Sequence, residues 1–210
     1  MSDQVQRFED RRWAAREQPT VERHRSAVGL VRRAPVLDVG GGDGLFLSLL
    51  QQRGIADVHL LDVSPVAVDR ARAKGITAAV GDITGTLPYS DGQFGTACAL
   101  DVLEHLYDPL ATLRELARVA SEVVVSVPNF GYWKERWQML AGQVPFQSRP
   151  ARGHVYWFTP ATAAAMAADA GLRVDEVDFG GLRRLGPVGP KLARLRPSLF
   201  ATTFTARLVP

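Results

Sequence analysis

Cysteine and long apolar runs are nearly missing from this chain, and each shortage excludes a class of protein. The single cysteine, Cys98, excludes an intrachain disulfide framework and a metal site caged by cysteines. No apolar run reaches transmembrane length, so no membrane partner is expected. Residues 1–20 alternate charges and lack the apolar segment of a secretory leader. We therefore expect a cytoplasmic protein.

Lysine is scarce as well, although the chain carries a small net charge of +3. Arginine supplies nearly all of the positive charge, and two stretches, 149–152 and 183–196, are rich in it. Such stretches form either a solvated surface or a patch that attracts an anionic substrate or nucleic acid. Aromatic residues are not regularly interleaved with these arginines, which argues against a nucleic-acid partner.

The middle of the chain shows the alternation of strand and helix patterns that is typical of an α/β fold. Apolar residues make up 46% of the 210 residues, which is enough for one core. Short apolar runs alternate with helical segments, several of which begin at a capping residue followed by proline. This alternation predicts a doubly wound parallel sheet with helices on both faces. The expected strands are 35–40, 57–63, 76–82, 92–103 and 122–128, and the helices between them are 44–54, 64–75 and 108–120.

Residues before 35 and after 128 do not follow this alternation of strands and helices. Two polar helices are expected at 4–17 and 21–33, and residues 129–158 are aromatic-rich and irregular. Two consecutive strands near the end, joined by a long loop, predict an antiparallel hairpin that closes one edge of the sheet. The elements expected after the irregular segment are a helix at 159–171 and strands at 172–180 and 199–209.

The segment "LDVGGGDG", residues 37–44, holds four glycines in five positions directly after the first strand. A tight turn explains one or two of them, whereas four indicate that a ligand approaches the backbone closely. The dinucleotide pattern G-x-G-x-x-G fits poorly, and the phosphate-binding pattern that ends in Gly-Lys is absent. The acid at Asp38 would repel a pyrophosphate but suits a cation. The pattern Asp38, Gly40, Gly42, Gly44 therefore favours S-adenosylmethionine, which carries a sulfonium and an ammonium group.

Two more aspartates follow the next two strands. Asp62 stands about twenty residues beyond the glycines, where an acid accepts from ribose hydroxyls. Asp82 is placed to accept from the adenine amine, with Val63 and Ile83 flanking the ring. A single aspartate at the end of a strand is usually a cap or a solvent-facing residue. Three successive strands that end in an acid at one rim favour a nucleoside site.

These segments together resemble a known family. The set "VLDVGGGDG", "LLDVSP", "VGDI", "FGTACALDVLEHLYDP" and "VVVSVPN" is similar to class I S-adenosylmethionine-dependent methyltransferases of the small-molecule "type 11" kind, over about residues 35–128. Within that group, "VPNFGYWKERWQMLAGQVP" resembles MetW-type proteins linked to methionine biosynthesis. The resemblance implies a seven-stranded Rossmann-like sheet with the cofactor lying across strands one to four.

The resemblance also places the chemistry in "LDVLEHLYD", residues 100–108. Asp101 and Val102 are expected to contact the cofactor, and Glu104 and His105 to face the methyl acceptor. His105 has the ordinary pKa of a general base, and His154 is a second candidate for that role. The alternative is that Glu104 and His105 have only a structural role at the start of a loop. Some relatives hold a metal here, but two ligands are weak support, so we predict no metal.

Acceptor specificity is expected outside the sheet. The first 34 residues, with Trp13, form a helical lid in this prediction, and residues 35–210 form the methyltransferase domain with a cap insertion at 129–158. The cap aromatics either line an acceptor pocket or hold the cap together. Arg149 or Arg152 would suit an acceptor carboxylate. The ring side chains considered for such a pocket are Phe130, Tyr132, Trp133, Trp137, Phe146, His154, Tyr156 and Trp157.

Three residues are expected to take no part in the chemistry. Cys98 lies in an apolar strand and is predicted to be buried. His59 is expected to be packed or solvent-facing, and His24, on a charged helix, to be exposed.

Two functions follow from this pattern, and a weaker third stays open. The first is an enzyme that transfers a methyl group in line from S-adenosylmethionine to an oxygen or nitrogen of a small molecule, leaving S-adenosylhomocysteine. The second is a MetW-like accessory protein that binds a partner enzyme, with a homodimer also open. The third is methylation of RNA or protein. The chain lacks the Asn/Asp-Pro-Pro-aromatic motif of enzymes that methylate nucleic-acid bases, which argues against base N-methylation.

Overall fold

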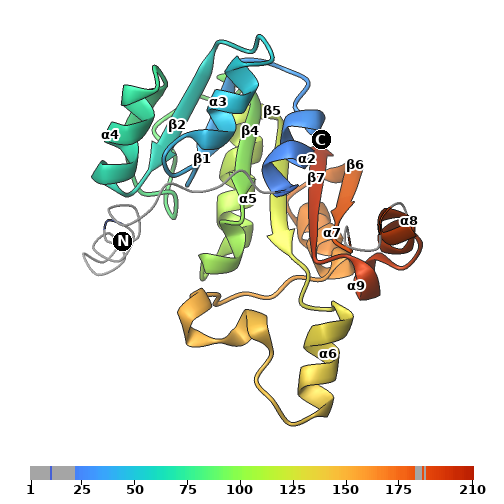
Figure 1. Cartoon of the computed structure of the whole chain (residues 1–210). Helices are drawn as coiled ribbons and strands as arrows, with labels where there is room; N and C mark the ends of the chain where they lie inside the picture. Colours follow the sequence, from blue (N-terminus) through green and yellow to red (C-terminus); the bar gives the residue numbers. More distant parts are fainter. Residues whose placement is uncertain (1–9, 11–21, 183–185, 187) are drawn as a thin grey trace.

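A seven-stranded sheet forms the centre of the computed structural model, which describes residues 10, 22–182, 186 and 188–210. The strand order is β3-β2-β1-β4-β5-β7-β6 (Figure 1). Strands β1 to β5 are parallel, and β7 runs antiparallel to both β5 and β6. The predicted parallel sheet with an antiparallel hairpin at one edge is therefore confirmed. The strands are β1 (Val36–Val39), β2 (Val58–Asp62), β3 (Thr77–Val80), β4 (Phe94–Leu100), β5 (Ala120–Pro128), β6 (Arg173–Gly180) and β7 (Thr203–Val209).

Most helices begin where the sequence predicts. In α4, the Ser64 hydroxyl accepts from the Ala67 amide, and in α5 Asp108 accepts from Ala111. Thr159 and Thr162 form a capping box at the start of α7. The helices are α2 (Glu22–Leu30), α3 (Leu45–Gln51), α4 (Pro65–Ala73), α5 (Pro109–Val119), α6 (Trp133–Leu140), α7 (Pro160–Asp169), α8 (Val188–Leu195) and α9 (Pro197–Phe200), with short 3₁₀ turns η1 (Leu103–His105), η2 (Phe146–Ser148) and η3 (Pro150–Arg152). None of the helices in the described ranges is long and apolar enough to cross a membrane.

Each face of the sheet carries its own buried cluster. On one face, α5 and α7 pack Leu113, Leu116 and Met166 against strand residues such as Val125. On the other face, α2, α3 and α4 do the same, and Cys98 is buried there as predicted. Because both faces are covered, the central strands β1 and β4 are almost completely buried, whereas the edge strand β3 is largely exposed.

The strand order reverses between β1 and β4, since the chain adds β2 and β3 on one side of β1 before it adds β4 on the other. Ligands of open parallel sheets bind at the carboxyl ends of the strands at such a point. Strand β4 ends at Leu100, three residues before the predicted end, because Asp101 takes a left-handed backbone conformation with φ 56°. The predicted start of the last strand at 199 is also wrong, because α9 occupies Pro197–Phe200.

The cap, residues 129–158, is more regular and more exposed than predicted. It contains α6, which stands out from the sheet beyond the end of β5 (Figure 1). The cap begins and ends at one place, because Asn129 and Phe158 form a β-bridge and the Phe130 amide donates to the Phe158 carbonyl. Five of its aromatics are at least one-third exposed, so packing inside the cap does not account for them. These five are Trp133, Trp137, Phe146, Tyr156 and Trp157.

Helix α2 packs as a layer of the sheet domain. Its residues Ala27, Val28 and Leu30 belong to the same buried cluster as α3 and the strands. This part of the predicted N-terminal lid is therefore core, and the rest of that lid, including Trp13 and helix 4–17, lies outside the described residues except for Asp10. His24 is buried, at 6% exposure, which corrects the prediction of an exposed side chain. The polar pattern of the helix hid this inward face.

Burial of His24 should make the protein sensitive to acid. Burial, with the nearby Arg23 charge adding to it, lowers the pKa of His24 from its ordinary 6.5 to about 4. Between these values the unfolded chain binds more protons, so stability falls as pH drops from about 6.5 to about 4. The full effect is about 3 kcal/mol. Denaturant titrations at pH 7 and pH 5 should show a smaller pH difference for His24→Gln than for the wild type, and equal differences would contradict the assignment.

Candidate functional site

The glycine turn after β1 is shaped by its backbone. Gly40, Gly42 and Gly44 have φ angles of 66°, 59° and 74°, a region that favours glycine. Gly41 is different, since its φ is ordinary but a Cβ there would lie 2.2 Å from Asp38 Oδ2. The turn therefore needs Gly41 in order to leave room for the buried carboxylate of Asp38. At Gly40 and Gly44 an added Cβ would meet Val102 at 2.8 Å and Ile76 at 2.4 Å, so these glycines also allow close packing; their role toward a ligand stays a prediction.

Asp38 lies beneath this turn at the end of β1 and is 1% exposed. Its Oδ1 atom is buried and has no hydrogen-bond partner among the described residues. Burial raises the pKa of Asp38 well above its ordinary value, and the neighbouring charge of Asp62 raises it further. A buried carboxylate in this state has unused capacity to bind a cationic group.

Asp62 ends β2 beside Asp38 and connects two loops. One of its carboxylate oxygens accepts from the Gly42 amide at 2.9 Å, and the other accepts from the Ser64 amide at 2.9 Å. The Ser64 hydroxyl also donates to Asp10, which places that residue at this rim. A carboxylate has about four acceptor sites, which is more than these two amide bonds use.

The second acid of the glycine turn, Asp43, has a structural role that the sequence analysis missed. Its carboxylate is buried and forms an ion pair with Lys74 at 2.7 Å. Lys74 also donates to the Asp43 carbonyl at 2.9 Å. The pair ties the turn to the end of α4. The sequence offered one signal for this contact: lysine is scarce, and Lys74 is one of only three lysines in the chain.

The outer part of the rim holds the third predicted acid. Asp82 lies two residues beyond β3, where its carboxylate accepts from the Thr84 amide at 2.8 Å and the Thr84 hydroxyl at 2.7 Å. Ile83 is buried, and Val63 is half-buried after β2. The three side chains therefore follow two adjacent strands, as the nucleoside prediction requires.

Asp101 closes the rim after β4. Its carboxylate accepts from the Ser126 hydroxyl at 2.9 Å and pairs with Arg23 of α2 at 3.2 Å. Arg23 was not predicted as a site residue, since nothing local in its helix marks it. Val102 follows and lies against Gly40, where an added Cβ would come within 2.8 Å of Val102 Cγ2. Of the two predicted residues, Val102 is thus at the glycine turn, and Asp101 precedes it directly after β4.

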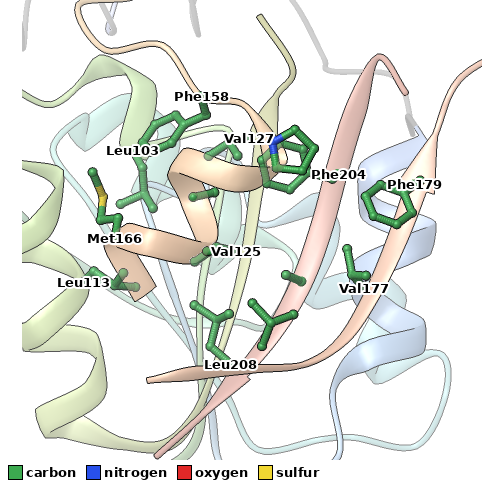
Figure 2. Close-up of a pocket in the computed structure, with 15 residues that line it drawn as sticks. Leu103, Leu113, Val125, Val127, Phe158, Met166, Val177, Phe179, Phe204 and Leu208 are labelled. Carbon is green, nitrogen blue, oxygen red and sulfur yellow. The ribbon is translucent and has the colours of Figure 1, made fainter. Parts of the chain in front are cut away.

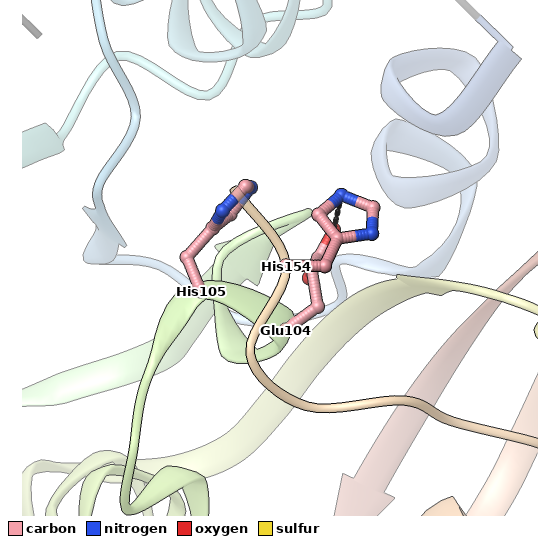
Figure 3. A group of neighbouring side chains, drawn as sticks. All are labelled: Glu104, His105 and His154. Carbon is pink, nitrogen blue, oxygen red and sulfur yellow. Dashed lines mark ion pairs between the residues drawn. The ribbon is translucent and has the colours of Figure 1, made fainter. Parts of the chain in front are cut away.

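The three predicted catalytic residues lie close together (Figure 3), with one side-chain nitrogen or oxygen of each within 4.8 Å of the others. Glu104 and His105 lie in η1, and His154 comes from the cap. His154 Nε2 is 4.0 Å from Glu104 Oε1, and the two histidine rings are 4.9 Å apart. Burial raises the pKa of Glu104 well above its ordinary value, with the Asp101 charge adding to it. The structure brings these residues together; their catalytic role stays a prediction.

The predicted anion-binding arginines lie at the outside of the cap. Arg149 and Arg152 are exposed, and their guanidinium groups lie 5.7 Å and 5.0 Å from the ring of Phe146. Such cation–π contacts are modest at exposed sites. The arginines are thus stacked on an aromatic side chain, and a role toward an acceptor carboxylate stays a prediction.

An apolar cavity of about 210 Å³ lies behind η1, between α7 and strands β5, β7 and β6 (Figure 2). Leu103 and Phe158 line its end nearest to Glu104, and Val177 lies toward the exposed edge of β6. Its walls are almost entirely hydrocarbon, so it can take only an apolar group. The sequence did not predict this space.

Comparison with known proteins identifies the family. A family model described as "Methionine biosynthesis protein MetW" matches residues 23–169, well over half of the chain. The chain belongs to the MetW family. It is also similar to "Ubiquinone biosynthesis O-methyltransferase" of Pseudomonas paraeruginosa, at 29% identity over 153 residues, and of Xanthomonas euvesicatoria, at 28% over 158 residues. These alignments cover 68% and 69% of this chain, and 66% and 64% of those proteins, which is just under two thirds of their length.

Solved structures confirm the fold of this MetW-family protein. A chain from a complex between the Haloferax volcanii Trm112 methyltransferase activator and a methyltransferase matches with a TM-score of 0.68 and 24% identity, covering 97% of this chain and 96% of that one. Magnesium protoporphyrin IX methyltransferase from Synechocystis, solved with bound S-adenosylhomocysteine, gives 0.67 and 18%, covering 98% and 97%. The predicted Rossmann-like methyltransferase fold and the resemblance to class I methyltransferases are confirmed.

Proposed function

We propose that this protein is a methyltransferase that uses S-adenosylmethionine and acts on a small-molecule acceptor. One observation carries the proposal: a buried carboxylate with an unused oxygen, Asp38, lies beside Asp62 under a turn from which side chains are excluded. Two adjacent buried acids favour a cationic ligand over a phosphate. S-adenosylmethionine supplies a methyl group activated by its sulfonium. The names of the similar proteins support the same chemistry.

The predicted cofactor residues fit such a ligand in three groups. Asp38 would bind the ammonium group below the turn formed by Gly40, Gly42 and Gly44. Asp62 would accept from the ribose hydroxyls while it keeps its bonds to the two backbone amides. At the remaining contacts, Asp82, Val63 and Ile83 would hold the adenine, and Asp101 and Val102 would flank the methionine end.

The acceptor side lies at Glu104, His105 and His154. These side chains are next to Asp101, so an acceptor bound there meets the methyl group from the side of the cap. An oxygen acceptor must lose a proton, and a nearby imidazole or carboxylate can accept it. The names of the relatives favour an oxygen acceptor over a nitrogen one. The apolar cavity beside Leu103 suits an acceptor with a hydrocarbon part.

Calorimetry with S-adenosylmethionine and S-adenosylhomocysteine tests the cofactor site. We expect micromolar binding, on the order of −8 kcal/mol. Asp62→Asn keeps the size of the side chain but removes its charge, and should weaken binding by about 2–4 kcal/mol. Asp69→Asn is the matched control, because Asp69 is an exposed acid on α4 that pairs only with Arg72 among the described residues. No binding by the wild type, or equal binding by both variants, would remove the proposal's basis.

Transfer to an acceptor needs its own measurement. Incubation with cofactor that carries a labelled methyl group and a panel of phenols, carboxylic acids and amines should label one class. Labelling of phenols alone would support O-methylation. A cofactor-binding protein that labels none of them would favour the second candidate function.

That second candidate is an accessory protein that binds a partner, as the match to the MetW family model allows. The supporting observation is the outer surface of α6 and the segment after it, where Trp137, Leu140 and Val144 are 65%, 82% and 60% exposed. Exposed apolar residues gathered on one projecting element are typical of interaction sites. Trp137→Ala combined with Leu140→Ala should leave cofactor affinity unchanged and abolish association, measured as mass by light scattering with a copy or with the partner enzyme.

A further inference from the structure

A helix with small side chains covers the antiparallel edge of the sheet. Six of the ten residues of α7 are alanine, and Ala163 and Ala164 lie on the side that faces β5, β7 and β6. Larger side chains normally fill the space between a helix and a sheet, because protein interiors are packed as densely as organic crystals. Here the methyl groups of α7 do not reach the strands, and this is the origin of the apolar cavity of about 210 Å³ (Figure 2).

The side chains around this cavity select for hydrocarbon. All fifteen described residues that line it are apolar, and its largest side chains include Phe204, Phe179 and Leu208. A charged or hydrogen-bonding group inside would lose its water without gaining a partner from these side chains, which is unfavourable. Cavities with such walls stay dry and bind apolar molecules.

The volume of the cavity sets the size of its ligand. A cavity of about 150 Å³ with similar walls accommodates benzene, and its six carbons scale to about eight carbons at this volume. A hydrocarbon chain of that length, or the end of a longer one, would fill the space. Burial of each further methylene should tighten binding about fourfold until the cavity is full.

The cavity has an entrance at the edge of the sheet. Strand β6 is the last in the sheet order, and Val174 and Val177 of this strand line the cavity although they are 41% and 37% exposed. Leu103 and Phe158 close the end nearest to Glu104, at 2% and 1% exposure. Covering the exposed valines with hydrocarbon would remove apolar surface from water. An unused packing defect is the competing explanation, but a solvent-accessible apolar entrance favours a ligand.

The closed end of the cavity adjoins the proposed acceptor side. Leu103 directly precedes Glu104 in η1. The ring of Phe158 lies 4.9 Å from the ring of Tyr156, and the Tyr156 amide donates to the Glu104 carbonyl at 3.0 Å. A chain that reaches Leu103 and Phe158 would therefore contact the segments that position Glu104.

We propose that this cavity binds a hydrocarbon chain of about eight carbons, or the end of a longer chain, between the β6 edge and Leu103. Two sources share this chemistry. One is a separate single-chain amphiphile, whose polar end would stay outside at β6. The other is the tail of the methyl acceptor, which would pass Leu103 from the side of Glu104. Binding of the chain does not depend on the proposed methyl transfer, whereas the second source rests on that proposed function.

Methionine methyl NMR reports binding at this place. Of the three methionines in the chain, Met166 lines the cavity and Met139 is exposed on α6. With ¹³C at the methionine methyl groups, titration with 1-octanol should shift the Met166 signal and leave the Met139 signal unchanged. 1-Butanol, which is shorter by four methylenes, should bind roughly 200-fold more weakly. Absence of a Met166 shift, or equal binding of the two alcohols, would overturn the proposal.

Ala163→Leu fills the cavity from α7. We expect it to weaken 1-octanol binding at least about tenfold without lowering the melting temperature, because the added carbons occupy existing space. Ala165→Leu is the matched control, since Ala165 is exposed on the same helix and does not line the cavity. Equal binding by the two variants would contradict the site. If Ala163→Leu does not fold, the comparison of alcohols on the wild type decides.

Light scattering tests whether a second copy of the chain occupies the cavity instead. A mass of two chains that Ala163→Leu reduces to one would overturn the proposal. We expect both proteins to have the same mass.

Methyl transfer distinguishes the two sources of the chain. For an acceptor tail, transfer to 4-octylphenol should exceed transfer to phenol in the wild type but not in Ala163→Leu. Equal transfer to both phenols by a protein that binds 1-octanol would assign the cavity to a separate amphiphile, and either result supports the site. Cofactor binding without a Met166 shift would reject the cavity inference alone. A Met166 shift without cofactor binding would reject the proposed function alone.

Discussion

Gly41→Ala should weaken binding of S-adenosylhomocysteine about a hundredfold. The new Cβ would lie 2.2 Å from Asp38 Oδ2 and 2.6 Å from Asp38 Cγ. It could not move away toward Leu60, because Leu60 Cδ1 is already only 3.1 Å from it. The carboxylate of Asp38 would have to leave its place under the turn. The cofactor would then lose a charge-assisted hydrogen bond worth about 1.5–3 kcal/mol. Each ~1.4 kcal/mol corresponds to a tenfold change in affinity. Overpacking should also cost about 1–3 kcal/mol of stability. Calorimetry and denaturant titration measure the two effects.

Gly85→Ala is the control for that experiment. Gly85 also lies in a loop and has no positive φ, but an added Cβ there meets nothing within 4 Å. Its stability and affinity should match those of the wild type. If Gly41→Ala also behaved like the wild type, the turn would be looser than its geometry requires, and Asp38 would not be the group that binds the cofactor.

Asn129→Asp should destabilise the protein by about 3–5 kcal/mol, because it places an uncompensated negative charge in a buried site. Asn129 is fully buried at the end of β5 and is the only asparagine in the chain. Its amide nitrogen donates to the carbonyls of Pro197, Ser198 and Ala201, at 3.1, 3.3 and 2.8 Å. Its oxygen accepts from Gly131. A carboxylate of the same shape would face three carbonyl oxygens with no hydrogen to offer.

Asn129→Ala separates the charge from the lost hydrogen bonds. It should also destabilise, but by less than Asn129→Asp, because it leaves polar groups unpaired without adding a charge. Denaturant titration at neutral pH gives both values. Equal stabilities for the wild type and Asn129→Asp would mean that the carbonyls turn away, and that Asn129 does not hold the cap to α9.

Local signals predicted the strands and the positions of the acids at their ends well. The strand ends that carry Asp38, Asp62 and Asp82 are fixed by short apolar runs and by neighbouring glycine and proline residues, so each could be placed from a few residues. Caps such as Ser64 and Asp108 are equally local. The order of the strands needed the family resemblance, because pairing between distant strands leaves little trace in a single sequence.

The contacts that the sequence did not predict join distant segments. Arg23 reaches Asp101 across 78 positions, and nothing in the polar helix at 21–33 distinguishes its inward side. The approach of His154 to Glu104 could not be predicted for the same reason, because His154 comes from a segment without clear periodicity. His154 was chosen only as an alternative base, and the fold is what places it beside Glu104.

The β-bridge at which the cap starts and ends affects how this family can diversify. The bridge between Asn129 and Phe158 makes residues 130–157 an excursion that leaves and rejoins the fold at one point. Such an insertion can be exchanged between relatives without altering strand register. Exchange would also alter the proposed acceptor side, because the same insertion carries both the exposed surface of α6 and His154. A change of interaction partner and a change of reactivity could therefore be inherited in one step.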